Sequence, residues 1–280
     1  MDHVIPIFIL FGPPVLFGLV LWAMVRWQRH LIFHPRRTIL PLPPVVEETR
    51  QEVGILTADG LLLSAWFFPP PDPEAPVILY FHGNTGNLTT GGETFRHLLT
   101  LDAGILGVDY RGYGESEGIP SEEGLAMDAR AAWDWLVGEA GIHPRRIVLY
   151  GRSLGSAVAV RLAAETATGA RGLIMESGFA DIYTLGAELY PFMPESCARY
   201  RFPSREWVAK REVPLLIAHS EQESYIKIHH AHALQAAARP PCHLVVLKGG
   251  HEHGWRESWD FYGSVLRAFI HHPESYRRTN

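Results

Sequence analysis

Apolar positions divide the chain into a charge-free beginning and a long alternating body. Residues 4–25 contain no charged side chain. A helix of that length spans about 33 Å, which is enough for the roughly 30 Å hydrocarbon core of a bilayer. Trp22 and Trp27 lie near its carboxyl end, where interfacial aromatic residues are expected. The pattern predicts a transmembrane helix over residues 4–25, with a cleaved signal peptide or a buried core helix as the alternatives.

The flanks of this segment indicate its orientation. Pro13-Pro14 predicts a kink or an interruption of the helix, because proline lacks the amide hydrogen. No Lys or Arg precedes the apolar run, and four arginines follow it: Arg26, Arg29, Arg36 and Arg37. The positive-inside bias then predicts a single-pass membrane protein whose body faces the cytoplasm. Residues 26–46 are predicted to form a basic, proline-rich linker.

The body alternates short apolar runs with amphipathic stretches. This alternation predicts an α/β fold with a mostly parallel, twisted sheet and helices on both faces. The first two runs flank Ala58-Asp59-Gly60 and suggest a hairpin. The predicted strands are residues 47–56, 61–67, 77–81, 105–109, 147–150, 172–175, 215–219 and 242–247, and the predicted helices are residues 88–99, 122–137, 154–166, 228–238 and 258–270. The sequence therefore predicts one domain over residues 47–280.

Charge and composition exclude several classes of function. The 280 residues include 25 Lys and Arg against 30 Asp and Glu, a formal net charge of −5 at pH 7 with neutral histidines. This balance lacks the basic face that nucleic-acid binding needs. Two cysteines outside any metal-like spacing support neither a disulfide scaffold nor structural zinc. His229, His230 and His232 lack the i, i+4 pairing of a helical metal site, so we expect them at the solvated surface and predict no metal or cofactor.

Two segments match Gly-x-Ser-x-Gly, the pattern of a nucleophilic serine on a sharp strand-to-helix turn. Ser153 follows a solid apolar run and precedes a stretch of small residues that can form a helix close to the sheet. Ser116 has no strand before it and stands between two glutamates, which disfavour the oxyanion formed during acyl transfer. The sequence therefore predicts Ser153 as the nucleophile and Ser116 as part of a loop.

A serine hydroxyl needs a histidine to take its proton and a carboxylate to orient that histidine. His251 follows the last apolar run and a flexible Gly-Gly pair, and His253 is its rival. The acid is expected after the preceding apolar run, because the order along the chain is serine, acid, histidine. The candidate acids are Glu223, which is preferred, and then Glu221, Glu176 and Asp181.

Several stretches together carry a resemblance to a known family. They are Tyr80-Phe81-His82-Gly83-Asn84-Thr85-Gly86-Asn87, Asp109-Tyr110-Arg111-Gly112-Tyr113-Gly114-Glu115-Ser116, the turn at Gly151, and Glu176-Ser177-Gly178-Phe179. In this order they resemble the Bem46-like branch of the α/β-hydrolase superfamily, over residues 47–270. The resemblance implies an α/β-hydrolase fold, here preceded by the transmembrane helix. The short insert 180–213 predicts a small cap over an open pocket.

The resemblance also implies roles for individual residues. Carried over by position, these are Ser153 as nucleophile, Glu223 as acid, His251 as base, and the backbone amides of Asn84 and Leu154 as the oxyanion hole. Leu154 begins a helix, whose free amides and dipole favour an anion. His82 is expected to brace its loop. The chain departs from the family's usual His-Gly-x-x-Asp at His219-Ser220-Glu221-Gln222-Glu223, which puts the identity of the acid in question.

These residues predict a membrane-anchored serine hydrolase that acts through an acyl-enzyme. The expected substrate is a carboxylic ester or thioester of small-molecule or lipid-like character. Two alternatives remain: a peptidase or amidase that uses the same triad, and a hydrolase-like scaffold without activity, which only the altered acid loop supports. The sequence does not indicate an oligomeric state.

Overall fold

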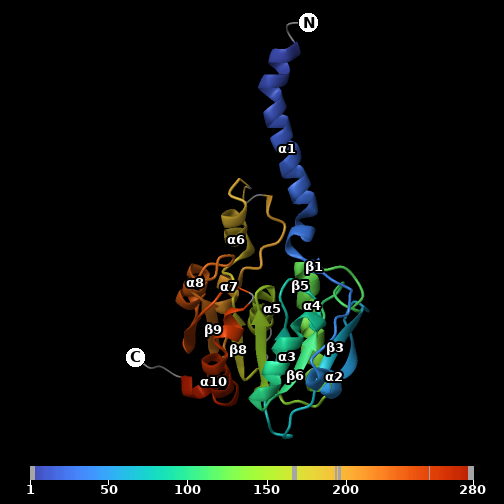
Figure 1. Ribbon diagram of the computed structural model, residues 1–280, viewed down its shortest axis with the longest axis vertical. Coiled ribbons are helices and arrows are strands. Elements are labelled where there is room, and N and C mark those ends of the chain that lie inside the picture. Colours follow the sequence, from blue (N-terminus) through green and yellow to red (C-terminus); the bar gives the residue numbers. More distant parts are fainter. Residues whose placement is uncertain (1–3, 166–168, 193, 195–196, 252, 277–280) are drawn as a thin grey trace.

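The computed structural model describes residues 4–165, 169–192, 194, 197–251 and 253–276, with the side chains of all but residues 4–14 and 276. Helix α1 (Val4–Ile32) projects from an α/β body (Figure 1). It runs through Pro13-Pro14, so the predicted interruption is absent. Within the residues whose side chains are described, no helix is long and apolar enough to cross a membrane. Residues 4–14 of the predicted span lie outside those side chains.

The body is built on one twisted sheet. Its strands are β2 (Gln51–Leu56), β3 (Leu62–Phe68), β4 (Val77–Phe81), β6 (Gly104–Val108), β7 (Ile147–Arg152), β8 (Gly172–Glu176), β9 (Leu215–Ser220) and β10 (Cys242–Leu247). Within the described residues the order is β10-β9-β8-β7-β4-β6-β3-β2. β3 runs antiparallel to β2 and β6, and the remaining neighbours are parallel. The predicted hairpin is confirmed, and so are the predicted strands apart from the start of the first one.

Helices cover both faces of this sheet. The helices that overlap predicted ones are α3 (Gly92–Leu98), α4 (Glu122–Gly138), α5 (Leu154–Glu165), α8 (His229–Ala237) and α10 (Trp259–His271). Alternate side chains of β4 divide between two buried clusters, as the two-residue period of a strand requires. Val77, Leu79 and Phe81 pack with residues of α4, α5 and α8, whereas Ile78 and Tyr80 pack with residues of α3 and α10. The core therefore lies on both sides of the sheet.

The start of the first predicted strand is wrong. Residues 47–49 form the end of a short helix, α2 (Pro44–Thr49), and β2 begins only at Gln51. Pro44 stands at the first helical position, where its fixed φ favours helix and its missing amide hydrogen costs nothing. Val46 of this helix is fully buried and belongs to the same apolar cluster as residues of α3.

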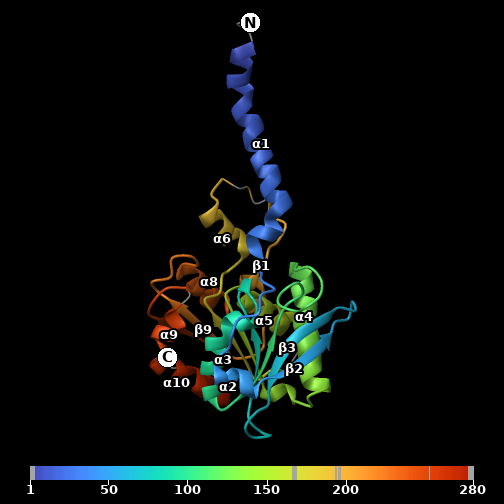
Figure 2. The same ribbon diagram turned by 45° about the vertical axis from the view of Figure 1, so that its right-hand side comes forward.

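The insert after β8 lies over the carboxyl edge of the sheet. Of its two helices, α6 (Ile182–Leu189) forms the predicted small cap, whereas α7 (Ser204–Val208) packs against α5 and α8. Both ribbon views place α6 beside the lower part of α1 (Figure 2). Since the parallel strands β4, β7, β9 and β10 all end at this edge, the segments that follow them meet beneath the cap.

Candidate active site

Ser153 occupies the turn between β7 and α5. Its φ is 53°, in the left-handed region that a non-glycine residue enters at a cost of about 1 kcal/mol or more. A Cβ on Gly151 would lie 2.0 Å from the carbonyl oxygen of Gly155, and a Cβ on Gly155 would lie 2.0 Å from that of Phe81. A side chain at either position would clash with the backbone, so both positions require glycine. Together the two glycines allow the sharp turn that carries Ser153 at the end of the strand.

His251 and Glu223 face each other across the segments that follow β10 and β9. His251 Nδ1 lies 2.5 Å from Glu223 Oε2, and the Glu223 side chain is buried. The other carboxylate oxygen accepts hydrogen bonds from the amides of Tyr225 at 2.9 Å and Ile226 at 3.2 Å. Burial disfavours the carboxylate, but His251 and these two amides outweigh it, so the pKa of Glu223 is lowered. Glu223 is therefore ionised at neutral pH.

The alternative acids are engaged elsewhere. Glu176 is buried and accepts hydrogen bonds from the hydroxyls of Tyr150 and Tyr262. Asp181 caps α6 by accepting hydrogen bonds from the amide and hydroxyl of Thr184. Glu221 and the rival histidine His253 are exposed. Among the described residues, Glu223 is the one carboxylate that contacts His251.

The second serine motif has a structural role. The Ser116 side chain is fully buried, and its hydroxyl donates to the carbonyl of Asp109 at 2.7 Å. It also accepts from the amide of Ser64 at 2.9 Å, so it ties its loop to β3. Ser116 is thus part of a loop, as predicted, and its hydroxyl already donates one hydrogen bond and accepts another.

Three residues that sequence reasoning did not single out join the site's loops. The Ser220 hydroxyl donates to the Gly249 carbonyl, and the Gln222 side-chain oxygen accepts from the Gly249 amide at 3.1 Å. Arg152, next to the serine, donates to the His251 carbonyl at 3.1 Å. The serine in place of the family's usual glycine therefore fastens the acid loop to the histidine loop. The sequence signal that could have indicated this role is that Ser220 stands where the family usually has glycine.

The candidate oxyanion hole lies where β4 and β7 end. Leu154 is the first residue of α5, and Asn84 follows β4 by three positions. The carbonyl of Asn84 accepts from the Tyr113 hydroxyl at 2.8 Å, which fixes the loop. His82 braces this region as predicted: its Nδ1 lies 2.7 Å from the Gly83 carbonyl, and its ring packs on Tyr113.

A mostly apolar pocket opens above Ser153, between α1 and α6. Its cavity volume is about 80 Å³, and Asn84, Ser153 and Leu154 form part of its lining. Tyr225 also lines it, with its ring centre 5.7 Å from that of His251. No hydrogen bond joins Ser153 to His251 within the part of the chain described. Such bonds often tighten only when substrate binds.

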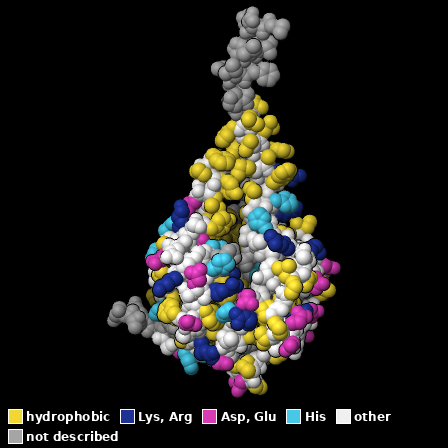
Figure 3. All heavy atoms as spheres, viewed as in Figure 1, with side chains coloured by type: hydrophobic (Ala, Val, Ile, Leu, Met, Phe, Trp, Pro, Cys, Tyr) yellow, Lys and Arg dark blue, Asp and Glu magenta, His cyan; other side chains and the backbone are white. Residues whose placement is uncertain are grey.

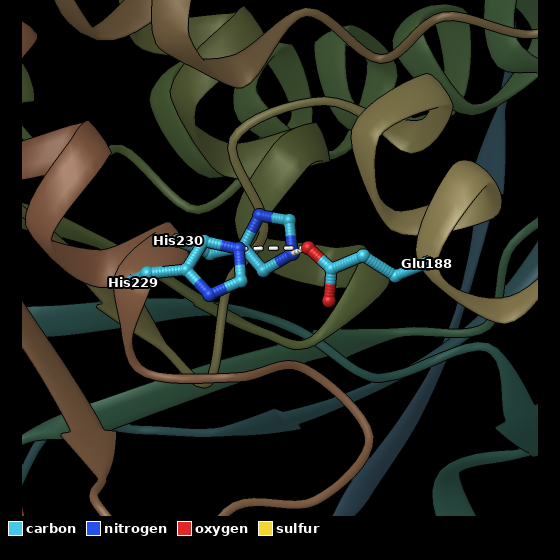
Figure 4. A group of neighbouring side chains, drawn as sticks. All are labelled: Glu188, His229 and His230. Atoms are coloured by element: carbon cyan, nitrogen blue, oxygen red, sulfur yellow. Dashed lines mark ion pairs between the residues drawn. The ribbon is translucent and has the colours of Figure 1, made fainter. Parts of the chain in front are cut away.

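Glu188 of α6 and His229 and His230 of α8 bring three potential metal-ligand atoms within 4.8 Å of one another (Figure 4). Glu188 Oε1 lies 2.7 Å from His229 Nε2 and 3.4 Å from His230 Nε2. The Nδ1 of His230 accepts the amide hydrogen of Ala180 at 3.3 Å, which leaves the proton of the neutral ring on Nε2. A metal ligand must give up that proton. The cluster therefore fits a polar contact that joins α6 of the cap to α8 better than it fits a metal site.

Burial corrects one expectation about these histidines. His229 and His232 are exposed, as predicted, but His230 is fully buried, so its predicted place at the solvated surface is wrong. The residue lies on the inner side of α8 beside Ala231 and Leu234, and burial lowers its pKa. Residue spacing alone could not show this, since the cap that covers His230 comes from another part of the chain.

The titration of Glu223 gives a stability prediction. Because its pKa lies below the ordinary 4.5 in the folded protein, its contribution is fully present above that pH and is lost as the pH falls through the folded-state value. We expect Glu223→Gln to lower the free energy of unfolding by about 2 kcal/mol at neutral pH. The difference from wild type should shrink as the pH drops below 4.5, as measured by urea denaturation. A difference that stays constant or grows there contradicts the assignment.

A mostly parallel sheet with a serine on a strained strand-to-helix turn defines the α/β-hydrolase fold class. Comparison with known proteins agrees. The family model described as "alpha/beta hydrolase fold" matches residues 76–213, which include the serine turn but not the acid or histidine loops. A relative named an alpha/beta hydrolase domain-containing protein is also 31% identical to this chain and covers 96% of it, so the chain belongs to the α/β hydrolase family.

Relatives and solved structures support this membership. The chain is 31% identical over 298 residues to the Arabidopsis thaliana alpha/beta hydrolase domain-containing protein WAV2, with 96% of this chain and 95% of the relative covered. It is 32% identical over 196 residues to the Rattus norvegicus lysophosphatidylserine lipase ABHD12, which covers 62% of this chain and 48% of the relative. The Pyrococcus furiosus esterase Pf2001 shares the fold, with a TM-score of 0.70, 19% identity, and coverage of 85% of this chain and 98% of that one.

Proposed function

We propose that this protein is a serine hydrolase that cleaves carboxylic esters or thioesters through an acyl-enzyme. The observation that carries the proposal is the strained Ser153 in the lining of an apolar pocket, together with a His251 that contacts the buried Glu223. Ser153 is the nucleophile, His251 the base and Glu223 the orienting acid. The amides of Asn84 and Leu154 form the oxyanion hole.

The contact with Glu223 sets the order of proton transfers. With Nδ1 of His251 donating to Glu223, Nε2 is the nitrogen that takes the Ser153 proton as Oγ bonds to the acyl carbon. The carbonyl electron pair moves to oxygen, where the two amides stabilise it. Collapse breaks the bond to the alcohol or thiol, which leaves with the proton from His251. Water then attacks the acyl-enzyme by the same route and releases the acid.

The pocket supports an apolar acyl group as the part of the substrate that lies beside Ser153. Aromatic and aliphatic side chains of the cap line it, among them Phe179, Leu185 and Tyr200. The rat relative ABHD12 is a lysophosphatidylserine lipase by name. These observations favour a lipid-like or small-molecule acyl ester as the substrate class.

A matched substrate series tests the proposal. Ester, thioester and amide derivatives of one acyl group should be compared with purified full-length protein, with Ser153→Ala as the blank. We expect ester and thioester hydrolysis above the blank, and amide hydrolysis slower by about a hundredfold or more, since an amine is the poorer leaving group. Faster amide cleavage would instead support a peptidase or amidase. No turnover of any member would support the inactive scaffold.

We further propose that the protein is membrane-associated through its N-terminal helix, with residues 47–280 as the hydrolase domain and residues 26–46, which include the end of α1, connecting the two. Support comes from the charge-free residues 4–25 and from the apolar surface that Figure 3 shows along the described part of the projecting helix. The large apolar side chains exposed there include Val15, Leu16, Phe17, Leu19, Val20, Trp22 and Trp27. The arginines behind this segment favour a cytoplasmic body. Protease treatment of sealed vesicles tests the side: digestion of the body from the outer face contradicts it.

A further inference from the structure

The last turn of α1 forms part of the candidate active site. Gln28, Leu31 and Ile32 line the same pocket as Ser153. Leu31 retains 37% exposure, so its side chain stands at the wall of the pocket rather than in the core. Across from it the pocket is lined by Leu189 of α6, which is also 37% exposed. The pocket beside the serine is therefore bounded by these two helices.

Gln28 fastens α1 to the cap. Its side-chain nitrogen donates to the Cys197 carbonyl at 2.5 Å, and its side-chain oxygen accepts from the Arg199 amide at 2.8 Å. Gln28 is 4% exposed, although the neighbouring Trp27 is 65% exposed. One glutamine thus satisfies two backbone groups of the loop between α6 and α7, and this holds the far wall of the pocket against α1.

The segment that leaves α1 also reaches the candidate oxyanion hole. The side-chain nitrogen of Asn84 donates to the carbonyl of Ile32 at 3.1 Å, and the amide of His34 donates to the carbonyl of Asn84 at 3.0 Å. Beyond this point β1 (His34–Pro35) pairs in parallel with β5 (Thr85–Gly86). The loop that carries the proposed oxyanion donor is therefore held from one side by the N-terminal segment.

We propose that the last turn of α1 is a working part of the active site: Leu31 limits the acyl-chain length, and Gln28 is a positioning residue that holds the cap over the chain. The inference rests on the proposed esterase function and deepens it. A short acyl group needs only the serine and the oxyanion hole. A long one needs the space between α1 and α6, so changes at these two residues act selectively on long chains.

The test compares p-nitrophenyl acetate with p-nitrophenyl octanoate on the full chain in detergent, with rates normalised to active sites titrated by a fluorophosphonate. We expect Leu31→Trp to lower kcat/KM for the octanoate by about tenfold or more, and to leave the acetate within about twofold. Gln28→Met keeps the length of the side chain but neither hydrogen bond. It should raise KM for the octanoate about tenfold with kcat little changed.

Trp27→Ala is the matched control, because Trp27 adjoins Gln28 but does not line the pocket. It should leave the octanoate-to-acetate ratio of kcat/KM unchanged. An unchanged ratio in Leu31→Trp, or an equal loss for both esters in both pocket variants, overturns the inference while the esterase function stands. A wild-type protein that hydrolyses neither ester overturns the function itself, and the inference with it.

Discussion

Ser153→Ala is expected to lower kcat/KM for ester hydrolysis by about 10⁴-fold or more, since removal of the nucleophile leaves only binding and the oxyanion hole. The substitution deletes one oxygen at a position whose strained backbone is set by Gly151 and Gly155, so the fold should persist. Steady-state kinetics with a chromogenic ester measure the loss, and circular dichroism checks the fold. Activity retained to within about tenfold would refute the nucleophile.

Ser116→Ala provides the control on the second motif. It loses the hydrogen bonds to Ser64 and Asp109 and should cost about 1 kcal/mol of stability for each of them. Turnover per labelled active site should stay within about twofold of wild type. A loss of turnover as large as that of Ser153→Ala would shift the assignment to the loop serine.

His251→Ala has the second largest expected effect. It removes the base that contacts Glu223 and should lower kcat/KM by about 10³-fold to 10⁴-fold. Because serine and histidine act as a unit, the Ser153→Ala/His251→Ala double variant should be no slower than the slower single variant. The exposed neighbour His253 is the matched control, and His253→Ala should remain within about twofold of wild type. The opposite ranking of the two histidines would overturn the assignment.

Much of this architecture could be predicted because the signals are local. Solid apolar runs such as residues 77–81 mark buried parallel strands, and the structure has a strand at each predicted place. The Ser153 turn is encoded by its own neighbours, since strand, glycines and helix are contiguous in the chain. Candidate acids could be ranked for a similar reason, because Glu223 follows a recognisable strand. The roles of these residues remain predictions until activity is measured.

Other features were not predicted, most of them because they depend on residues far apart in the sequence. Gln28 meets Cys197 and Arg199 across more than half the chain, and nothing around Gln28 indicates that contact. The burial of His230 depends on the cap above α8. Residues 47–49 form the end of α2 because Pro44 starts a helix just before a strand-forming segment. In each case tertiary contact or a short local signal outweighed the hydrophobic pattern.

Covalent labelling tests the central claim most directly. A fluorophosphonate reacts with an activated serine and leaves a stable adduct on its Oγ, which intact-protein mass and peptide mapping locate. The account predicts one adduct per chain, on Ser153, with none in Ser153→Ala and strongly slowed labelling in His251→Ala. An adduct on Ser116, undiminished labelling of Ser153→Ala, or no labelling of the wild-type protein would contradict it.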